Sequence, residues 1–476
     1  MKVHGSYAGL SLLGLLTVCI SFPGHLGAQM VRSDKIAKIE ALFSDIHRPD
    51  RPGLALGISE RGEPVFSKGF GMANLETGAV FRPETVSDIG SVAKQMTCLG
   101  IVLLAQEGKL SLDDDIRKYF PNTPEVVAPI RIRHLIHHVS GLREVYAMLE
   151  LSGWKSGDGI RQDHAYDLLE HAESLNFAPG ERYSYCNTAY MLLGEIIRKV
   201  SGERFEAWMQ DRIFKPLGMD HTYIMDVQGE IFPNCAESYG PILPKGWSKI
   251  YDNSTAYGQG GVYSTIPDML RWADNFRTAR IGGEQGIAQM LQRGVLNNGD
   301  TLDYAFGIEE LRYRGLRILQ HTGSSAGYRA IITLVPGSEI AIVLKSNYAV
   351  FNGIKATEQI LDILFEGSLE APTPARPSAP APRPVAIPID ARTMASYLGS
   401  YHAPELETTF NVWEAEGKLA FGSRRWGRAL MEPIAPDHFV CDGLPEIQFE
   451  RDKKGAVRAL RFSNGELQGV LMKKIQ

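Results

Sequence analysis

The chain has 476 residues, more than one ordinary domain holds, so we expect two or three structural units. Hydrophobic residues make up 44% and charged residues 22%, a balance typical of a globular protein with a sizeable core. The formal net charge of −5 argues against nucleic acid or an anionic membrane surface as a partner.

The N-terminus has the pattern of an export signal. Lys2 supplies positive charge, the apolar run LSLLGLLTVCI follows, and small residues in GHLGAQ allow cleavage after Ala28. A membrane anchor is the alternative, but this run is too short to span a bilayer comfortably and no second long apolar run follows. We therefore predict a signal peptide over residues 1–28 and a mature protein that is periplasmic or secreted and not membrane-spanning.

The mature chain opens with a helical pattern, SDKIAKIEALFSDI, followed by the β-rich runs LALGISE and EPVFSKGF. The turn Arg61-Gly62 between these two runs predicts a β-hairpin. The next element, DIGSVAKQMTCLGIVLLAQEGKL over residues 88–110, is apolar around its whole circumference, which predicts a buried helix that ends near Gly108.

A lysine inside that helix is the first candidate for chemistry. Lys94 lies one turn after Ser91, on the same face and within reach of its hydroxyl, with a poor route to water. Desolvation lowers the pKa of a lysine, and a neutral amine can take the proton of a serine. Backbone N–H groups at the helix start can also polarise an oxyanion. We predict Ser91 as a nucleophile beside Lys94.

Two other patterns along the helical middle of the chain carry less weight. A second S-x-x-K copy, Ser152 to Lys155, lies in the Gly-rich polar stretch LSGWKSGDG, and a loop holds no fixed Ser–Lys geometry. The cluster His134, His137 and His138 suggests a metal, but no HExxH glutamate accompanies it and no Cys or Asp completes a site. We therefore expect no metal and no cofactor.

Two further motifs follow at a distance. Tyr185-Cys186-Asn187 comes after the turn Pro179-Gly180 and just before an apolar helix, although ordinary turn chemistry is an alternative explanation for it. His321-Thr322-Gly323 stands at the mouth of a predicted strand. The overlapping G-x-S-x-G pattern would make Ser325 a nucleophile, but that motif needs a helix after it and YRAIITLV is a strand pattern.

The strands YRAIITLV and EIAIVLKS, joined by Pro336-Gly337-Ser338, predict a second hairpin, and the helix VFNGIKATEQILDILFEG follows it. Strands at both ends and helices between them predict an α+β fold: an antiparallel sheet flanked by helices with an inserted helical subdomain. The expected catalytic domain covers residues 29–368.

A linker and a small domain complete the predicted organisation. Seven prolines between Pro372 and Pro388 predict an extended linker over residues 369–390. Residues 391–476 alternate polar and apolar positions, with turn signals at Glu416-Gly417, Lys454-Gly455 and Asn464-Gly465, and predict an all-β, barrel-like domain. Cys98, Cys186, Cys235 and Cys441 are too widely spaced for a disulfide framework, so we favour free buried thiols over a single bridge.

The three motifs, in type and order, resemble those of the serine β-lactamase and penicillin-binding-protein superfamily. The chain most resembles the group that holds class C β-lactamases, D-aminopeptidases, D-Ala-D-Ala carboxypeptidases and related esterases. IRHLIHHVSGL, NFAPGERYSY and YGQGGVYSTIPDMLRW support the resemblance, which covers about residues 35–365.

The resemblance implies a role for each motif residue. Ser91 would be the acylated nucleophile, and Lys94 and Tyr185 would share proton transfer, with the identity of the base left open. Asn187 would orient the substrate amide, and the backbone N–H groups of Ser91 and Ser324 would form the oxyanion hole. The substrate-binding positions implied on the third motif are His321, Thr322, Gly323 and Ser324.

Two departures from the family pattern bear on the substrate. Cys186 stands where Ser or Ala is more familiar, and His321 replaces a lysine. Histidine is mostly neutral near pH 7, which weakens the case for an obligatory substrate carboxylate. Arg329 could supply a replacement cation or could equally lie on an exposed strand face.

These observations predict an exported serine hydrolase that forms an acyl-enzyme on Ser91 and acts on small D-amino-acyl peptides, amides or esters. A class C-like β-lactamase is the first alternative, and a penicillin-binding sensor without turnover is the second. The only partner we expect is the peptide or small-molecule substrate, and the sequence leaves the oligomeric state open, a homo-oligomer included.

Overall fold

The computed structural model describes residues 31–127, 129–155, 157–372, 384–441 and 445–475. The predicted signal peptide, residues 1–28 with Cys19, lies outside the described residues, as do positions 373–383 of the predicted linker. The signal peptide, its cleavage and the exported location therefore stay predictions. Within the described ranges, every helix is too short or too polar to cross a lipid bilayer.

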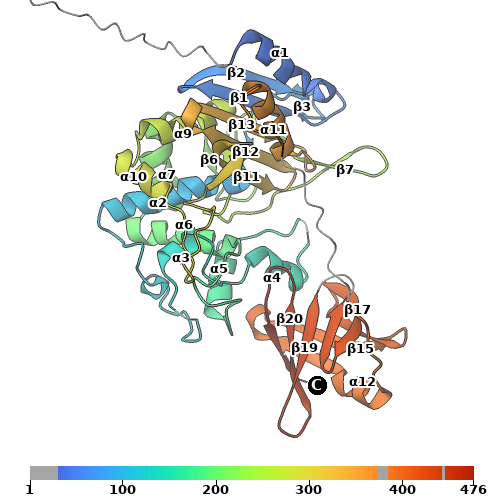
Figure 1. Cartoon of the computed structure of the whole chain (residues 1–476). Coiled ribbons are helices and arrows are strands. Elements are labelled where there is room, and N and C mark those ends of the chain that lie inside the picture. The colour runs from blue at the N-terminus through green and yellow to red at the C-terminus, as the bar shows by residue number, and fades with distance from the viewer. Residues whose placement is uncertain (1–30, 128, 156, 373–383, 442–444, 476) are drawn as a thin grey trace, which may run out of the picture.

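The sheet that organises the larger body is antiparallel and has six strands in the order β10-β11-β12-β13-β1-β2 (Figure 1). Both predicted hairpins are present, and β1 pairs with β13, so the two ends of this body meet in the middle of the sheet. The strands are β1 (Leu54–Glu60), β2 (Glu63–Phe70), β10 (Glu309–Tyr313), β11 (Leu316–Ser325), β12 (Tyr328–Val335) and β13 (Ile340–Ser346).

Helices cover both faces of this sheet, which explains why β13 is buried along its whole length. Ile340, Ile342 and Leu344 pack with α1 (Ser33–Ala41) and α11 (Gly353–Leu364) on one face. Alternate positions of β13 point to the other face, toward α9 (Ile266–Thr278). The period-two burial of the strands therefore builds a sheet between two helical layers.

The helical region lies between the two hairpins in the sequence and packs below the sheet in Figure 1. Its centre is the pair α2 (Lys94–Gln106) and α6 (Asn187–Ser201), which contact each other directly. The other helices are α3 (Ile132–Ile136), α4 (Val145–Leu151), α5 (Asp163–Glu170), α7 (Phe205–Met209), α8 (Lys215–Leu217) and α10 (Gly283–Met290). Short strands β3 (Met72–Asn74), β4 (Ala79–Val80), β5 (Ser87–Asp88), β6 (Tyr223–Ile224), β7 (Tyr239–Pro241), β8 (Trp247–Lys249) and β9 (Val262–Ser264) connect them.

The C-terminal segment forms a closed barrel of the strands β14 to β21, preceded by α12 (Ala391–Tyr397). Closure leaves no unpaired sheet edge. The barrel-like prediction is therefore confirmed, and the strands are β14 (Gly399–Ala403), β15 (Thr408–Ala415), β16 (Lys418–Ser423), β17 (Gly427–Ala435), β18 (His438–Cys441), β19 (Glu446–Arg451), β20 (Val457–Ser463) and β21 (Val470–Lys474).

Candidate active site

Ser91 lies in a 3-10 turn, Gly90–Ala93, that leads directly into α2. Gly90 has φ of 51°, and a Cβ at this position would lie 2.5 Å from the backbone nitrogen of Ser324 on β11. Only glycine permits this turn to approach the strand so closely. The close approach sets Ser91 beside β11 while its hydroxyl still faces a cavity.

The amine of Lys94 is fully buried and surrounded by acceptors. Its Nζ lies 2.8 Å from Oδ1 of Asn187, 2.7 Å from the carbonyl oxygen of Gln259 and 3.0 Å from Oγ of Ser91. A neutral amine has two N–H groups and one lone pair. When the amide oxygen and the carbonyl take the two N–H groups, the lone pair is left for the Ser91 hydroxyl.

The environment of Lys94 also favours that neutral form. Burial lowers the pKa of Lys94 to about 7, and the negative charge of Glu144 opposes this shift only in part. Near pH 7 a large share of the molecules therefore carries an unprotonated amine beside the serine.

Asn187 is the first residue of α6 and is held from behind by Glu144. The carboxylate accepts the backbone N–H of Asn187 at 2.5 Å and its side-chain amide at 2.9 Å. Because the amide nitrogen is occupied by Glu144, its oxygen is directed to Lys94. The rotamer of Asn187, and with it the acceptor for Lys94, is fixed by a buried carboxylate.

Tyr185 completes the group around the serine. Its phenol lies beside the Ser91 side chain, and the ring centroid lies 4.8 Å from Nζ of Lys94. Burial raises the pKa of Tyr185 well above its ordinary value, so the phenol keeps its proton at neutral pH. A protonated phenol can donate or relay a proton, and a neutral amine can act as a base.

The third motif lies on β11 and runs past the serine turn. A Cβ at Gly323 would lie 1.9 Å from the carbonyl oxygen of Ile89 and 3.2 Å from the backbone nitrogen of Ser91, so no larger residue fits there. Thr322 and Ser324 are exposed on the strand, and Ser324 lines the cavity with Ser91. The backbone nitrogens of Ser91 and Ser324 thus lie on adjoining segments, an arrangement that two N–H donors of an oxyanion hole would need.

His321 takes a different place from its motif neighbours. It is only 4% exposed, and it is not among the residues that line the cavity. Its Nε2 lies 3.1 Å from the hydroxyl of Tyr304, which lies 3.1 Å from Nε2 of His138. Burial lowers the pKa of His321 to about 3, so this histidine is neutral and presents no charge to a substrate.

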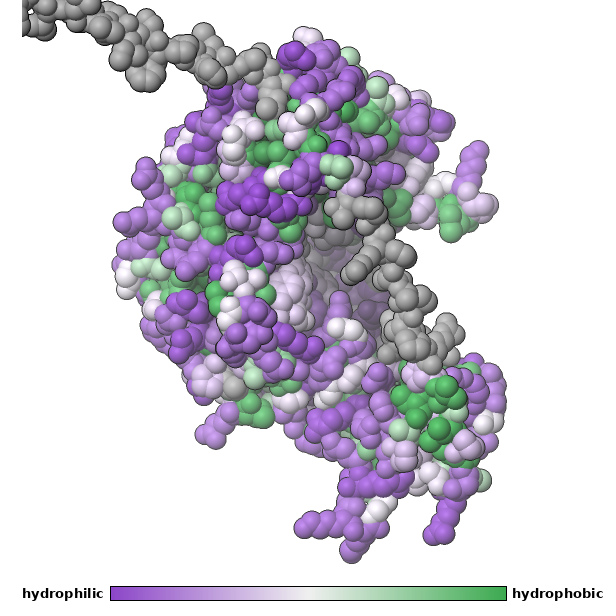
Figure 2. All heavy atoms as spheres, in the orientation of Figure 1, coloured by the Kyte–Doolittle hydropathy of each residue, from purple (hydrophilic) through white to green (hydrophobic). Residues whose placement is uncertain are grey.

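The cavity in front of Ser91 has a volume of about 590 Å³. Carboxylates outnumber cations on its wall: Glu150, Asp158 and Asp252 line it together with Lys155. Figure 2 shows a largely hydrophilic face that is hollowed between the larger body and the barrel. An acidic wall of this kind favours an amine-bearing substrate over a carboxylate-bearing one.

The remaining sequence candidates have other roles. Ser325 donates its hydroxyl to Asp252 at 2.7 Å, and the chain turns from it directly into β12 without a helix. Ser152 caps the end of α4 by donating to the carbonyl of Leu149. Within the part of the chain that the structure describes, no group of three His, Cys, Asp or Glu side chains is arranged to hold a metal ion.

Arg329 lies on β12 directly opposite Ser324. It lines a second, smaller cavity of about 390 Å³ together with Thr322 and Ser324. Its guanidinium donates to the backbone carbonyls of Ala326 and Tyr328. The cation thus stands next to the third motif.

Two site residues were not identified from the sequence. Glu144 lies two positions after IRHLIHHVSGL, and Gln259 lies within YGQGGVYSTIPDMLRW. Both residues are therefore in or beside segments that support the superfamily resemblance. Gln259 acts through its backbone carbonyl, which no side-chain pattern reports. Glu144 acts through a residue 43 positions away, a relationship that only the packing of α4 against α6 creates.

Solved structures with this architecture define the class of fold. The octameric penicillin-binding protein homologue from Pyrococcus abyssi matches with a TM-score of 0.61 at 23% identity, covering 92% of this chain and 100% of that one. D-amino acid amidase from Ochrobactrum anthropi matches with a TM-score of 0.58 at 22% identity, covering 70% and 99%. The fold is that of the β-lactamases and transpeptidases.

Sequence comparison gives the family. The Beta-lactamase family model matches residues 39–365, and the chain belongs to this family. Penicillin-binding protein 4* of Bacillus subtilis is 26% identical over 468 residues, covering 91% of this chain and 98% of that protein. D-aminopeptidase of Gluconobacter oxydans is 26% identical over 313 residues, which span 66% of this chain and 59% of that relative.

Proposed function

We propose that this protein is an exported serine hydrolase that forms an acyl-enzyme on Ser91 and acts on small D-amino-acyl peptides, amides or esters. The observation that carries the proposal is the buried amine of Lys94, with two fixed acceptors and the Ser91 hydroxyl around it. A buried lysine arranged in this way has little structural purpose, because an apolar residue would fill the helix at lower cost.

Acylation follows from these contacts. Oγ of Ser91 attacks the carbonyl carbon of the substrate as its proton passes to Nζ of Lys94. The carbonyl oxygen takes up negative charge in front of the backbone N–H groups of Ser91 and Ser324. When the tetrahedral intermediate collapses, the bond to the leaving amine or alcohol breaks, and Tyr185 relays the proton from Lys94 to that group.

Deacylation uses the same groups in the opposite sense. A water molecule gives a proton to the amine of Lys94 directly or through Tyr185, and its oxygen attacks the acyl carbon. The bond to Oγ of Ser91 then breaks, the serine regains its proton, and the acid product leaves.

The substrate class rests on the charge of the site. Even with Asp158 paired to Arg425, the carboxylates of Glu150 and Asp252 outnumber the one lysine that lines the main cavity. His321 is buried and neutral where relatives with a lysine would present a cation. Both features favour an acyl group that carries a free amine. Relatives of this chain named D-aminopeptidase support the same substrate class.

A β-lactamase is the second candidate, favoured by one observation. Arg329 stands beside Thr322 in the smaller cavity, where a cation can bind a substrate carboxylate. Steady-state kcat/KM values for D-Ala p-nitroanilide, a D-Ala-D-Ala peptide, p-nitrophenyl butyrate and nitrocefin separate the candidates. We expect the D-Ala amide to be preferred, and nitrocefin dominating by orders of magnitude would replace the proposal.

Ser91→Ala is the control for every substrate in that panel. Loss of all turnover in this variant is expected, together with loss of labelling by a covalent phosphonate. Wild-type protein that is labelled at Ser91 but releases no product would instead identify a penicillin-binding sensor.

A further inference from the structure

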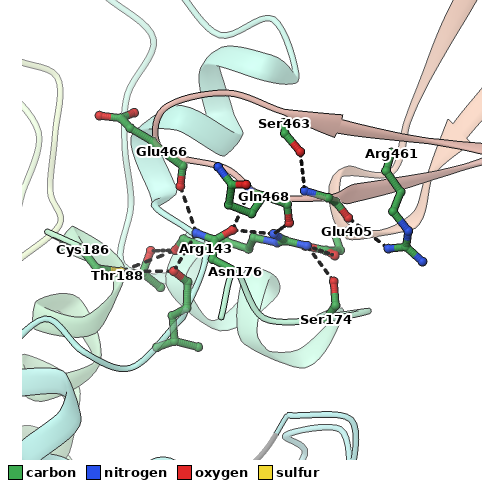
Figure 3. A network of polar contacts seen from close by, with 12 residues as sticks. Arg143, Ser174, Asn176, Cys186, Thr188, Glu405, Arg461, Ser463, Glu466 and Gln468 are labelled. Atoms are coloured by element: carbon green, nitrogen blue, oxygen red, sulfur yellow. Dashed lines mark hydrogen bonds and ion pairs between the residues drawn. The ribbon is translucent and has the colours of Figure 1, made fainter. Parts of the chain in front are cut away.

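The barrel is joined to the larger body by a buried ion pair. Nε of Arg143 lies 3.0 Å from Oε2 of Glu405, and the side chains are only 2% and 0% exposed (Figure 3). Arg143 precedes α4 in the larger body, and Glu405 lies in the connection between β14 and β15 of the barrel. A pair so completely removed from water is rare, because both ions must be desolvated.

The guanidinium of Arg143 is also satisfied from both sides of the domain boundary. It donates to the side chain of Asn176 and to Ser174, the latter at 2.8 Å, within the larger body. From the barrel it meets the backbone carbonyl of Gln468 in addition to Glu405 (Figure 3). Three of these five hydrogen bonds of the guanidinium therefore come from the barrel, two from Glu405 and one from Gln468.

The backbone of Arg143 reaches the catalytic motif. Its carbonyl oxygen accepts the hydroxyl of Thr188 at 2.6 Å and the thiol of Cys186 at 3.6 Å. These two residues flank Asn187, and the residue after Arg143 is Glu144, whose carboxylate holds Asn187. The side chain of Arg143 faces the barrel. Its carbonyl group and the next residue, Glu144, hold the segment of Asn187, which accepts a hydrogen bond from Lys94.

We propose that Glu405 of the barrel is a positioning residue for the catalytic centre, acting through Arg143 on the segment that holds Asn187 against Lys94. This inference rests on the proposed function and adds that full hydrolytic activity requires a docked barrel. Removing the carboxylate leaves the buried guanidinium without its counter-ion, and such a charge is too costly to remain in place. Arg143 then moves toward water and carries Glu144 with it.

A second contact places the barrel against the same wall of the cavity. Arg425, in the turn between β16 and β17, pairs with Asp158 at 2.5 Å. A Cβ at Gly153 would lie 2.3 Å from Cβ of Arg425, so this turn packs closely on the loop that follows α4. Arg143, Gly153 and Asp158 thus lie against the barrel, and Asp158 also lines the cavity in front of Ser91.

The test is Glu405→Gln in the full-length protein, a change that keeps the side-chain volume and removes the charge. We expect kcat, normalised to phosphonate-reactive sites, to fall about tenfold or more, because small misplacements of catalytic groups have effects of this size. KM is expected to change by no more than about twofold. The acidic limb of the pH profile should move to lower pH, because a displaced Glu144 no longer counteracts the desolvation of Lys94.

Glu173→Gln is the matched control. It breaks another ion pair between the larger body and the barrel, Lys473 with Glu173 at 2.9 Å, whose side chains are half-exposed and far in the chain from Glu144. We expect wild-type kcat and pH profile from it. Equal effects of the two substitutions, or an unchanged kcat and pH profile in Glu405→Gln, would overturn the inference.

Two further measurements cover the other outcomes. If Glu405→Gln does not fold, Glu405→Asp replaces it, because aspartate keeps the charge but is shorter by one methylene. We expect a smaller loss of kcat and a pH shift in the same direction. Wild-type kcat and pH profile in Glu405→Asp would contradict the inference. If the wild-type enzyme turns over no substrate, the proposed function fails, and the rate of phosphonate labelling of Ser91 still reports whether Glu405 positions the site.

Discussion

Glu144 binds Asn187 at two points, its backbone N–H and its side-chain amide. The amide oxygen of Asn187 is thereby free to accept from Lys94 at 2.8 Å. Glu144 is buried and does not itself line the cavity, so it acts on the reaction through Asn187 and through its charge near Lys94. Its hold on Asn187 explains why the Glu144 carboxylate lies close to Lys94, although its charge opposes the neutral form of the amine that would accept the serine proton.

Glu144→Gln should lower kcat/KM about 10- to 100-fold. A glutamine offers one oxygen where two donors of Asn187 require acceptors, and a lost hydrogen bond to a charged group is worth about 1.5–3 kcal/mol. The acidic limb should also move to lower pH, since the charge of Glu144 raises the pKa of Lys94. Kinetics from pH 5 to 9 measure both effects, with Glu203→Gln, a change at an exposed carboxylate away from the cavity, as the control.

The wild-type pH profile follows from Lys94 itself. Burial lowers its pKa to about 7, and the amine must be unprotonated to accept the proton of Ser91. Activity should therefore be low at pH 5, rise through about pH 7 and level off above it. A flat kcat/KM between pH 5 and 8 would show that Lys94 is not the group that controls the reaction.

The sequence predicted those parts of the fold and site that depend on local patterns. The hairpins and α11 follow from strand periodicity and turn residues, and the burial of Lys94 follows from the apolar circumference of α2. The contact of Ser91 with Lys94 follows from their spacing along one helix. The approach of Asn187 to this pair could be expected only from the resemblance, because the motifs lie about a hundred positions apart. Their meeting point depends on how α2 packs against α6.

His321 illustrates what the sequence could not predict. Its position in the third motif implied contact with substrate, but the structure buries its ring behind the strand. The surroundings of a side chain within β11 depend on partners such as Tyr304 and His138, which come from other segments of the chain. The ion pair of Arg143 with Glu405 is a similar case, since neither residue belongs to a motif and the two are 262 positions apart.

Asp252 should determine the preference for a free amine. It lines the cavity, and Ser325 donates to it at 2.7 Å. Burial, together with the charge of Asp252, raises the pKa of Asp88 well above its ordinary value and favours its protonated form. Of the two carboxyl groups only Asp252 lines the cavity, so it is the one that a substrate meets.

Asp252→Asn should therefore reduce kcat/KM for D-Ala p-nitroanilide about tenfold or more relative to its N-acetyl derivative, which has no ammonium group. The ratio of the two values is the measurement, and Glu203→Gln, at an exposed carboxylate that does not line the cavity, should leave this ratio within about twofold. An unchanged ratio in Asp252→Asn would remove Asp252 from substrate recognition.

Tyr304→Phe tests the buried hydrogen-bond chain behind the site. The backbone N–H of Cys186 donates to Nδ1 of His138, so in the neutral ring Nε2 carries the proton and donates to Tyr304. The hydroxyl of Tyr304 then donates to Nε2 of His321. Without this hydroxyl, one buried donor and one buried acceptor lose their partner together.

The free energy of unfolding of Tyr304→Phe should fall by about 1–3 kcal/mol, the cost of leaving buried polar groups unpaired. Urea denaturation followed by fluorescence measures it. Tyr183→Phe is the control, because that tyrosine is 38% exposed and its loss should change the unfolding free energy by less than about 0.5 kcal/mol. Tyr304→Phe should also lose activity, because His321 without its partner no longer fixes the strand that carries Thr322 and Ser324. Wild-type stability together with wild-type kcat in Tyr304→Phe would mean that His138 and His321 find other partners. The hydrogen bonds through Tyr304 would then not support β11.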